Sequence, residues 1–528
     1  MFPSPSFVSR LSESLQHDLA AFLPELILCG TVVVMLLARL VTGLGRTHLG
    51  GFALVMAALA LFSAVLFWPG VAPPETARPT TGFSGLLVFD TFGLYFRAFL
   101  LAFLVLSIWL SLATGIPDRE DSVDYLTLLI GGTLGMMLMA SANHLLTLFV
   151  AVEMASVPSY ALAGFLKGKR QGSEAALKYV VYGASAAGVM LYGISLVCGV
   201  YGTGSLPEIA HAIGQSRDGL PLPAVAGVVC VLVGLGFKLA AVPFHFWCPD
   251  VFEGAAAEVG AFLSVASKAA ALALSARFLF VLVTPTGDQH GEAARVVIGL
   301  AWGLFAAVTT TFGNLAALAQ TNLKRLLAYS TIAHAGLMMM ALLPVGPRSA
   351  GPLVYYVSAY LLMNLGAFAV VAFVRNRTGA EDVDSVRGLA RRSPVLAVGM
   401  AFFLLSLLGM PPLAGFAAKF QVFATLWETG RDYGRQDALL GWYYFGLLAV
   451  AALNTALSAG YYLRVIRAMT LDDPTDETPI RVPFGGQVLI GLLTALVLAA
   501  GILWDPLTKA ADQAAKSFDR PANVERRP

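Results

Sequence analysis

Four lysines lie inside long apolar stretches of this 528-residue chain, where a charged side chain is costly to keep. They are Lys178, Lys238, Lys268 and Lys419, and the chain has only nine lysines against 25 arginines. Arginine stays protonated at any working pH, whereas a lysine in apolar surroundings releases its proton more readily than one in water. The four lysines are therefore predicted to load and release protons, unless Lys178, near its helix start, only extends to the membrane interface.

Glu153 is the acidic counterpart of these lysines and lies in the stretch NHLLTLFVAVEMASVPSY. An isolated carboxylate in such a stretch is costly, so Glu153 is expected to be protonated or paired with a cation. Lys178 opens the next helix and is the expected counter-charge. Such a pair can be switched by a proton that arrives beside it. The alternative is that Glu153 is a purely structural charge partner.

The segment GFKLAAVPFHFWCPDVFEG, residues 236–254, combines a lysine with a helix break. Pro243 removes a helical hydrogen bond about one turn after Lys238. Broken helices at membrane depth persist only where the freed backbone is buried in protein or lines water. His245, just past the break, titrates near neutral pH. Lys238, His245 and Lys268 are predicted to form a relay in which bound water carries protons between side chains.

A second break precedes Lys419 in SLLGMPPLAGFAAKFQVF, where Pro-Pro-x-x-Gly interrupts the apolar run. A lysine beside a Gly/Pro break in corresponding spans of two five-helix units is typical of inverted repeats. In the second unit His334 lies on an apolar face (YSTIAHAGLMMM) and is either a packing residue or a member of the relay. In the first unit Asp250 and Glu253 follow the break and are expected to cap a helix and be solvated.

The composition indicates which elements must position these residues. Hydrophobic residues make up 57% of the chain and charged residues 12%, against about 25% charged in a soluble domain. Recurring apolar runs of about 20 residues predict an all-α polytopic membrane protein with about 14 transmembrane helices. The predicted spans are 21–42, 50–69, 89–114, 124–141, 143–166, 175–201, 223–247, 256–283, 294–317, 322–344, 350–375, 395–428, 441–468 and 485–505.

The predicted spans group into four regions. Residues 1–120 hold helices 1–3, residues 121–284 a first five-helix repeat (helices 4–8), residues 285–470 a second (helices 9–13), and residues 471–528 helix 14 with a polar tail. The tail after Asp505 is expected to fray. The four cysteines are scattered and form neither a metal-binding nor a disulfide pattern. The net charge of +2 gives no indication of a nucleic-acid partner.

Positive charge in short loops predicts the orientation of the chain, because such loops stay on the inner side. If the N-terminus is outside, the inner loops carry the denser positive charge, so both termini are predicted on the outer side. The outer loops are sparser and include Arg78 and Arg217. The inner loops carry Arg39, Arg46, Lys167, Lys169, Arg170, Lys324, Arg325, Arg375, Arg377, Arg387, Arg391, Arg392, Arg464, Arg467 and Arg481. No soluble domain is apparent, so a redox cofactor would lie on another chain.

The segment FKLAAVPFHFWCPDVFEGAAAEVGAFLSVASKAA resembles a stretch of the antiporter-like membrane subunits of respiratory complex I. The form PFHFWCPDVFEG is similar to the subunit N type and differs from the HxWLP form of the L, M and Mrp relatives. Further matches are LPELIL at residues 23–28, FDTFGLYFRAF at 89–99, NLKRLLAYSTIAHAG at 322–336 and GMPPLAGFAAKF at 409–420. Because they span nearly the whole chain in the family's order, the resemblance is highly specific.

The resemblance implies fourteen helices, two inverted five-helix repeats with discontinuous helices 7 and 12, and proton translocation driven by quinone reduction elsewhere in an NADH-quinone oxidoreductase. Carried over to this sequence, Glu153 and Lys238 form the input pair, Lys268 is the central lysine and Lys419 the terminal one. Lys178 and His245 match supporting positions.

The resemblance also implies where cofactors and partners lie. This chain would hold no cofactor, while NADH, FMN, iron–sulfur clusters and quinone would belong to partner subunits. The membrane partners would be an M-like antiporter subunit and small K-, J- and A-like subunits. The alanine- and arginine-rich usage favours a bacterial cell inner membrane.

One position departs from the family pattern. The family usually reads GAPTPVTAFLS where this chain has GAAAEVGAFLS, which introduces Glu258 about 15 Å along a helix before Lys268. Glu258 either adds a carboxylate to the proton intake or faces an inner vestibule. The departure is compatible with a divergent paralogue that has a different electron donor. Apart from this departure, three alternatives to the proton-pumping function stay open: an Mrp-type sodium/proton antiporter subunit, a non-pumping structural subunit of a divergent complex and, least favoured, a metabolite transporter.

Overall fold

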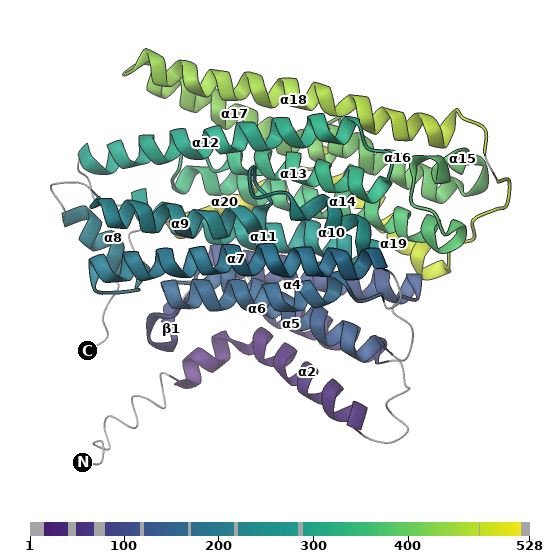
Figure 1. Ribbon diagram of the computed structural model, residues 1–528, viewed down its shortest axis with the longest axis horizontal. Coiled ribbons are helices and arrows are strands. Elements are labelled where there is room, and N and C mark those ends of the chain that lie inside the picture. Colours follow the sequence, from purple (N-terminus) through teal and green to yellow (C-terminus); the bar gives the residue numbers. More distant parts are fainter. Residues whose placement is uncertain are drawn as a thin grey trace.

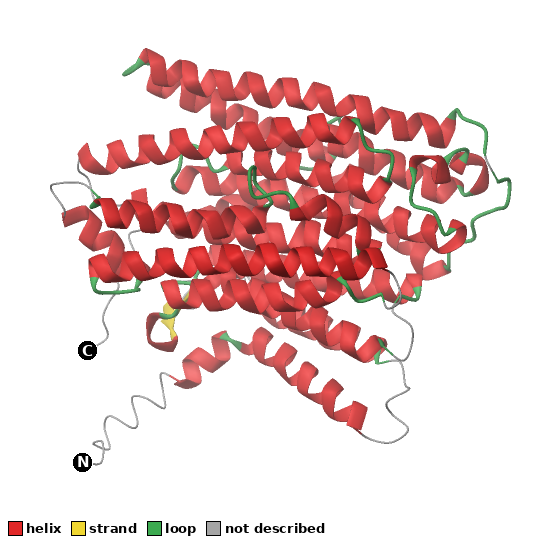
Figure 2. Cartoon of the chain, viewed as in Figure 1, coloured by secondary structure: helices red, strands yellow, loops and turns green. Residues whose placement is uncertain are grey.

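The computed structural model is a bundle of long helices that run back and forth along one direction (Figure 1). The structure describes residues 15–40, 49–67, 80–116, 121–166, 170–215, 220–283, 289–474 and 476–518. Within these ranges the chain is helical apart from loops and one small hairpin (Figure 2), in which β1 (Thr80–Gly82) pairs antiparallel with β2 (Leu87–Phe89). The prediction of an all-helical membrane protein is confirmed in this coarse form.

The helices follow the predicted apolar runs closely. Their bounds are α2 Leu23–Leu40, α3 Gly50–Leu66, α4 Thr91–Thr114, α5 Ser122–Ser141, α6 Leu145–Ala163, α7 Arg170–Tyr201, α8 Leu206–Gln215, α9 Leu222–Leu239, α10 Trp247–Gly254, α11 Ala257–Val283, α12 Gln289–Leu318, α13 Leu323–Ala341, α14 Ala350–Thr378, α15 Leu389–Arg392, α16 Pro394–Leu408, α17 Ala414–Gly434, α18 Ala438–Thr470, α19 Phe484–Ile502 and α20 Asp505–Ala515. The hairpin and the short helix α8 were not predicted.

Among the described residues, 11 helices are long and apolar enough to cross a membrane. They are α2, α4, α5, α6, α7, α9, α11, α12, α14, α18 and α19. The other three predicted spans coincide with shorter or more polar helices. The helices α3 and α16 are shorter than the 18 residues of the shortest spans, and α13 begins with the charged pair Lys324 and Arg325.

Helix α11 forms the centre of the bundle, and every residue of its most apolar stretch is buried. It packs against α4, α5, α9, α13 and α14. Helix α14, which is also largely buried, lies beside it and in turn contacts α16, α17 and α19. Any ionisable side chain on α11 is therefore held in the protein interior, away from lipid.

The outer helices expose apolar side chains, as expected of a protein in contact with lipid. Helix α2 lies at one edge of the bundle and α18 at the opposite edge (Figure 1). Exposed apolar side chains on these and other outer helices include Leu37, Leu177, Leu304 and Leu453. Apolar side chains therefore cover the outside of the bundle, while ionisable side chains such as Lys268 and Arg277 lie on the buried central helix α11.

The expectation that the chain frays after Asp505 is wrong up to residue 518. Helix α20 packs against α14 and α4, with Ala511 and Ala514 buried. The Thr91 hydroxyl donates to the carbonyl oxygen of Gln513 at 3.0 Å. Small alanines every third or fourth residue give this polar sequence one face that docks closely, which composition alone did not indicate.

Part of the orientation prediction lies outside the described residues. This applies to Arg46, Arg78, Lys167, Lys169 and Arg217 and to the outermost residues of both ends of the chain. The predicted placement of both termini on the outer side therefore stays a prediction.

Candidate functional site

The first helix break separates α9 from α10, as the proline in the sequence predicted. Helix α9 ends at Leu239, and Ala240 has φ 54° and ψ 37°, a left-handed conformation rare for a residue with a side chain. The backbone N–H of Val242 donates to the Thr309 hydroxyl at 3.0 Å, and the Trp247 indole donates to the Phe237 carbonyl at 3.0 Å. The polar groups freed by the break are thus partly satisfied inside the protein.

Lys238 lies in the last turn of α9 and is only 2% exposed. Its Nζ atom has no hydrogen-bond partner within the described part of the chain. Glu153 on α6 is its electrostatic neighbour. The predicted input pair therefore interacts electrostatically across α6 and α9, while Glu153 is half-buried and no ion pair within 4.0 Å joins the two side chains among the described residues.

Lys268 lies on α11, buried to 1% exposure, directly beside the first break. Its Nζ atom donates to the carbonyl oxygen of Leu239, the last residue of α9, at 2.6 Å. That carbonyl has no partner in its own helix because the helix ends there. The break thus supplies an acceptor for a lysine on another helix.

The second break separates α16 from α17 and is built around glycines. Helix α16 ends at Leu408, followed by Gly409 with φ 91°. The backbone N–H of Gly415 donates to the Ser406 hydroxyl at 3.0 Å. A Cβ atom on Gly415 would lie 1.8 Å from the Ser406 carbonyl oxygen, so the final glycine of Pro-Pro-x-x-Gly is sterically required.

Lys419 on α17 repeats the contact that Lys268 makes at the first break. It is 4% exposed, and its Nζ atom donates to the carbonyl oxygen of Leu408, the last residue of α16, at 3.0 Å. The C-terminus of a helix carries partial negative charge and favours a cation. Both lysines are therefore held at the carboxyl end of an interrupted helix.

The two candidate histidines have different surroundings. His245 is buried against the rings of Phe246 and Phe312, each with a centroid distance of 4.4 Å, and lies electrostatically close to Lys268. His334 is bound on both sides: Nδ1 lies 2.9 Å from the Tyr356 hydroxyl and Nε2 3.2 Å from the Tyr462 hydroxyl.

His334 also lies electrostatically close to Lys419. The two tyrosines that hold its ring, Tyr356 and Tyr462, were missed from the sequence. An aromatic residue in an apolar span gives no signal of a polar role until its partner is known.

Lys178 is not placed as expected. Its side chain is 39% exposed and pairs with Asp250 at 2.7 Å and with Glu174 at 2.9 Å. The expectation that it is the counter-charge of Glu153 is therefore wrong. Lys178 and Asp250 are 72 residues apart in the sequence, and only the packing of α10 against α7 brings them together.

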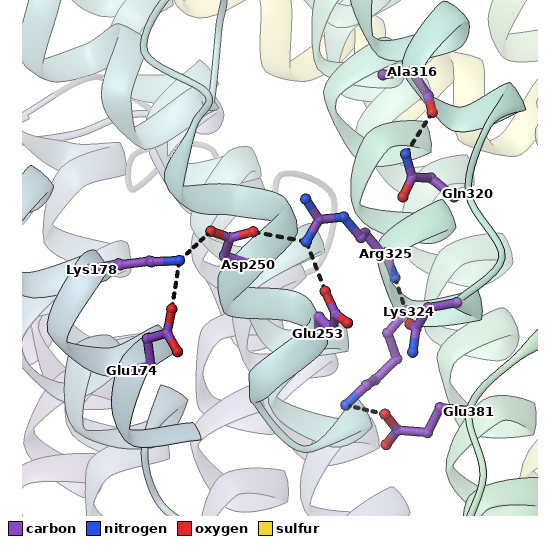
Figure 3. Close-up of polar contacts among 10 residues, drawn as sticks. Glu174, Lys178, Asp250, Glu253, Ala316, Gln320, Lys324, Arg325 and Glu381 are labelled. Carbon is purple, nitrogen blue, oxygen red and sulfur yellow. Dashed lines mark hydrogen bonds and ion pairs between the residues drawn. The ribbon is translucent and has the colours of Figure 1, made fainter. Parts of the chain in front are cut away.

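Asp250 and Glu253 do not serve as helix caps, contrary to expectation. Both carboxylates pair with Arg325, at 2.8 Å and 2.7 Å respectively (Figure 3). With the Lys178 contact, Asp250 links α7, α10 and α13. The second helix of the second predicted repeat, α13, is thereby connected to the segment that follows the break of the first.

A second group of charges lies at the same end of the bundle. Glu381 pairs with Lys324 at 2.8 Å and with Arg375 at 3.0 Å, and Figure 3 shows the Lys324 contact. Lys324 also donates to the carbonyl oxygen of Ala255, the residue after α10, at 2.6 Å. Glu258, in the first turn of α11, is buried close to this group.

Buried ion pairs hold the N-terminal helices and were also missed. Arg97 on α4 forms a two-pronged pair with Glu25 on α2, with Nε 2.6 Å from Oε1. Arg277 on α11 pairs in the same way with Asp90, at 2.9 Å and 2.6 Å. Glu25, Asp90 and Arg97 lie in the LPELIL and FDTFGLYFRAF motifs, but no spacing rule pairs charges across separate helices.

Among the residues that the structure describes, no group of three or more His, Cys, Asp or Glu side chains is arranged to hold a metal ion.

Comparison with known proteins gives a consistent result. The family model described as "NADH:quinone oxidoreductase/Mrp antiporter, TM" matches residues 142–434, more than half of the chain. The chain is 39% identical over 527 residues to NADH-quinone oxidoreductase subunit N of Anaeromyxobacter sp. (strain Fw109-5), covering 97% of this chain and 99% of that protein.

Solved structures agree with this sequence match. A chain of respiratory complex I from Thermus thermophilus has a TM-score of 0.73 and 32% identity, covering 93% of this chain and 99% of that one. A chain of the Mrp complex from Dietzia sp. DQ12-45-1b has a TM-score of 0.81 at 20% identity, covering 96% and 98%. At that identity the second likeness indicates the fold alone.

Proposed function

The chain belongs to the subunit N family of NADH-quinone oxidoreductase, and we propose that it moves protons through a relay of Glu153, Lys238, Lys268 and Lys419. It is a membrane, proton-translocating subunit of that enzyme. One observation carries the proposal: three lysines are buried to 4% exposure or less, in or beside two interrupted helices. Buried ionisable groups at membrane depth are functional by default, because each is costly to keep.

The relay begins with the pair of Glu153 and Lys238. Their mutual attraction favours the charged form of both, so separating them lets Lys238 release its proton. A conformational or electrostatic change transmitted from the quinone site would perform that separation. The lack of a hydrogen bond on Lys238 Nζ supports this role, because within the described ranges no hydrogen bond has to be broken when the amine moves.

Lys268 and Lys419 are the next two proton-carrying residues of the proposed relay. Each rests on a helix-terminal carbonyl oxygen, which accepts a hydrogen bond from the ammonium form and from the neutral amine alike. The lysine therefore stays in place when it gains or loses a proton. His245 beside Lys268 and His334 beside Lys419 are supporting positions that carry or orient water between the proton-carrying residues.

The energies involved are small enough for modest rearrangements. Moving one proton against 100 mV costs about 2.3 kcal/mol. A hundredfold change in the proton affinity of one lysine is worth about 2.7 kcal/mol. A lysine that gains or loses one charged neighbour in a low-dielectric interior experiences a change of this size.

The finer topology belongs to the same proposal. It comprises fourteen spans, two inverted repeats over residues 121–284 and 285–470, and discontinuous helices 7 and 12. The breaks after α9 and α16, which lie in the fourth helix of each five-helix unit, support the repeat. Both termini face the outer side of a bacterial inner membrane. NADH, FMN, iron–sulfur clusters and quinone lie on partner subunits, next to M-like and small K-, J- and A-like membrane subunits.

The decisive experiment is the variant Lys238→Ala in the assembled complex in sealed vesicles. Quinone-reduction rate and proton uptake are measured together, with and without sodium. Both are expected to fall at least about tenfold while the complex still assembles, since a positioned proton-transfer group contributes roughly 10²–10⁴-fold.

The matched control is Lys509→Ala, at an exposed position outside the relay. Unchanged electron transfer and unchanged proton stoichiometry in the Lys238 variant would make the chain a scaffold. A sodium requirement would instead favour the Mrp-type alternative.

A further inference from the structure

Glu258 is a buried carboxylate for which the proposed relay has no role. It is the second residue of α11 and is 3% exposed. Neither of its carboxylate oxygens has a hydrogen-bond partner within the described ranges. The hydroxyl of the nearby Thr114 donates to the carbonyl oxygens of Leu110, at 3.1 Å, and Ser111, at 3.3 Å, in its own helix. A buried acceptor without a donor is costly, so its presence at this position calls for a reason.

The surroundings of Glu258 contain groups that favour each of its protonation states. Lys324 on α13 and Arg375 on α14 act electrostatically on it, as does the amino end of α11 itself, and these favour the anion. Burial, at 3% exposure, opposes it. Burial therefore favours the acid, while the cations on α13 and α14 and the amino end of α11 favour the carboxylate.

A group of ion-paired side chains, Lys324, Arg375 and Glu381, lies between Glu258 and the end of the bundle. Lys324 and Arg375 both pair with Glu381, whose side chain is 16% exposed. Glu381 belongs to the loop between α14 and α15, which the positive-charge pattern predicts to face inside. The group therefore connects Glu258 to the side from which protons would be taken up.

On the other side of Glu258, polar atoms continue toward the centre of the membrane. Asn364 on α14 donates to the Ser264 hydroxyl on α11 at 2.6 Å, while its own carbonyl oxygen has no partner among the described residues. Ser264 is about 9 Å along the helix from Glu258 and one turn before Lys268. The free Asn364 oxygen is suited to hold a bridging water in this otherwise apolar stretch.

We infer that Glu258 is the proton-accepting carboxylate on the intake side of Lys268, linked to it through water held at Asn364 and Ser264. A hydronium ion protonates the Glu258 carboxylate, and the carboxylic acid then passes that proton through water to the neutral Lys268 amine. The carboxylate is restored and Lys268 becomes an ammonium, so charge and protons balance. The inference rests on the proposed function, in which Lys268 must be reloaded from the inner side.

The test compares Glu258→Gln, Glu258→Asp and Lys238→Ala in the whole complex in sealed vesicles. Glutamine keeps the shape and removes an unpartnered charge, so the complex is expected to assemble. Proton uptake and quinone reduction of Glu258→Gln are expected to fall about tenfold or more at alkaline pH, where free protons are scarce, and less at acid pH. Glu258→Asp is expected to recover most of the rate, because it restores an acid. Glu477→Gln, on an exposed loop, is the matched control.

A spectroscopic measurement separates proton transfer from a structural effect. Infrared difference spectra of the turning-over complex should contain a protonated-carboxyl band that disappears in Glu258→Gln and persists in Glu477→Gln. If Lys238→Ala stops pumping but Glu258→Gln matches the unmodified complex at every pH, the inference is wrong and the proposed function stands. If Lys238→Ala pumps normally, the proposed function fails whatever Glu258 does.

Discussion

Lys268 and Lys419 differ from surface lysines in what their Nζ atoms contact. Each donates to the last carbonyl oxygen of an interrupted helix, and each lies within the buried core. A water-exposed lysine has many alternative partners, whereas these two have one protein acceptor fixed by backbone geometry. The backbone carbonyl oxygen therefore fixes the position of the lysine amine, while the charged groups around the amine determine whether it is protonated.

Lys419→Arg tests this distinction at the residue scale. Arginine keeps the positive charge and can donate to Leu408, but it does not release its proton at any working pH. We expect the complex to assemble and proton uptake to fall at least about tenfold. The measurement is proton uptake per quinone reduced in sealed vesicles, with Lys509→Arg at an exposed position as the control. Normal pumping in Lys419→Arg would show that Lys419 does not change protonation during turnover.

At the scale of elements, the two breaks reach a similar geometry with different residues. The residue that ends the helix in a left-handed conformation is Ala240 in the first break and Gly409 in the second. Alanine is strained by about 1–2 kcal/mol in this conformation, whereas glycine is not. The first break is held by Thr309 and Lys268 from other helices and by Trp247, the first residue of α10, which donates back to α9. The second is held by the close approach of α16 to α17.

Gly415→Ala is expected to disrupt the second break. The added Cβ would lie 1.8 Å from the Ser406 carbonyl oxygen, a backbone atom that cannot move without separating α16 from α17. We expect the free energy of unfolding to fall by about 3 kcal/mol or more, with a loss of assembled complex. Thermal unfolding of the purified complex measures the effect.

The control is Gly491→Ala on α19, where an added Cβ meets nothing within 4 Å. It is expected to be neutral or slightly stabilising, because alanine favours a helix by roughly 1 kcal/mol over glycine. Equal stability of both variants would mean that the helices at the break separate freely.

At the scale of the whole molecule, ion pairs divide into two classes by burial. The network of Lys178, Asp250 and Arg325 is about one third exposed and is expected to contribute little to stability. Its position between the two predicted repeats suits transmission of a change in charge. The Arg97–Glu25 pair is almost fully buried and ties α2, at the edge of the bundle, to α4 (Figure 1).

Arg97→Met is expected to lower the free energy of unfolding by about 3–5 kcal/mol, because it leaves the Glu25 carboxylate buried without its partner. The loss should appear as lower thermal stability and as proteolysis of the N-terminal segment in the assembled complex. The double variant Glu25→Gln/Arg97→Met removes both charges and should recover most of the loss. If the double variant is as unstable as the single one, packing of the arginine stem, and not charge, holds α2.

Local patterns in the sequence allowed several features to be predicted. Apolar runs indicated the helices, since burial of backbone polar groups in lipid requires helix or closed barrel. Pro243, Pro411 and Pro412 indicated both breaks, because each lies inside an apolar run, where proline removes a helical hydrogen bond. The motifs around Lys238, Lys268 and Lys419 indicated the family, which the comparisons confirm. All of these depend on residues within one helix length of each other.

Only the tertiary structure decided which charges meet. Lys178 pairs with Asp250, 72 residues away, and not with Glu153, and Arg325 reaches back 75 residues to the same carboxylate. Packing between distant helices also decided three other features: the docking of α20, the tyrosines around His334 and the lack of a hydrogen bond to Glu258 within the described residues. Ion pairs and hydrogen bonds act over a few ångströms in space and carry no signal along the chain. Sequence therefore located the helices, both breaks and the buried lysines Lys238, Lys268 and Lys419. Helix packing decided the partners of the charged groups, the exposure of Lys178 and the burial of the Arg97–Glu25 pair.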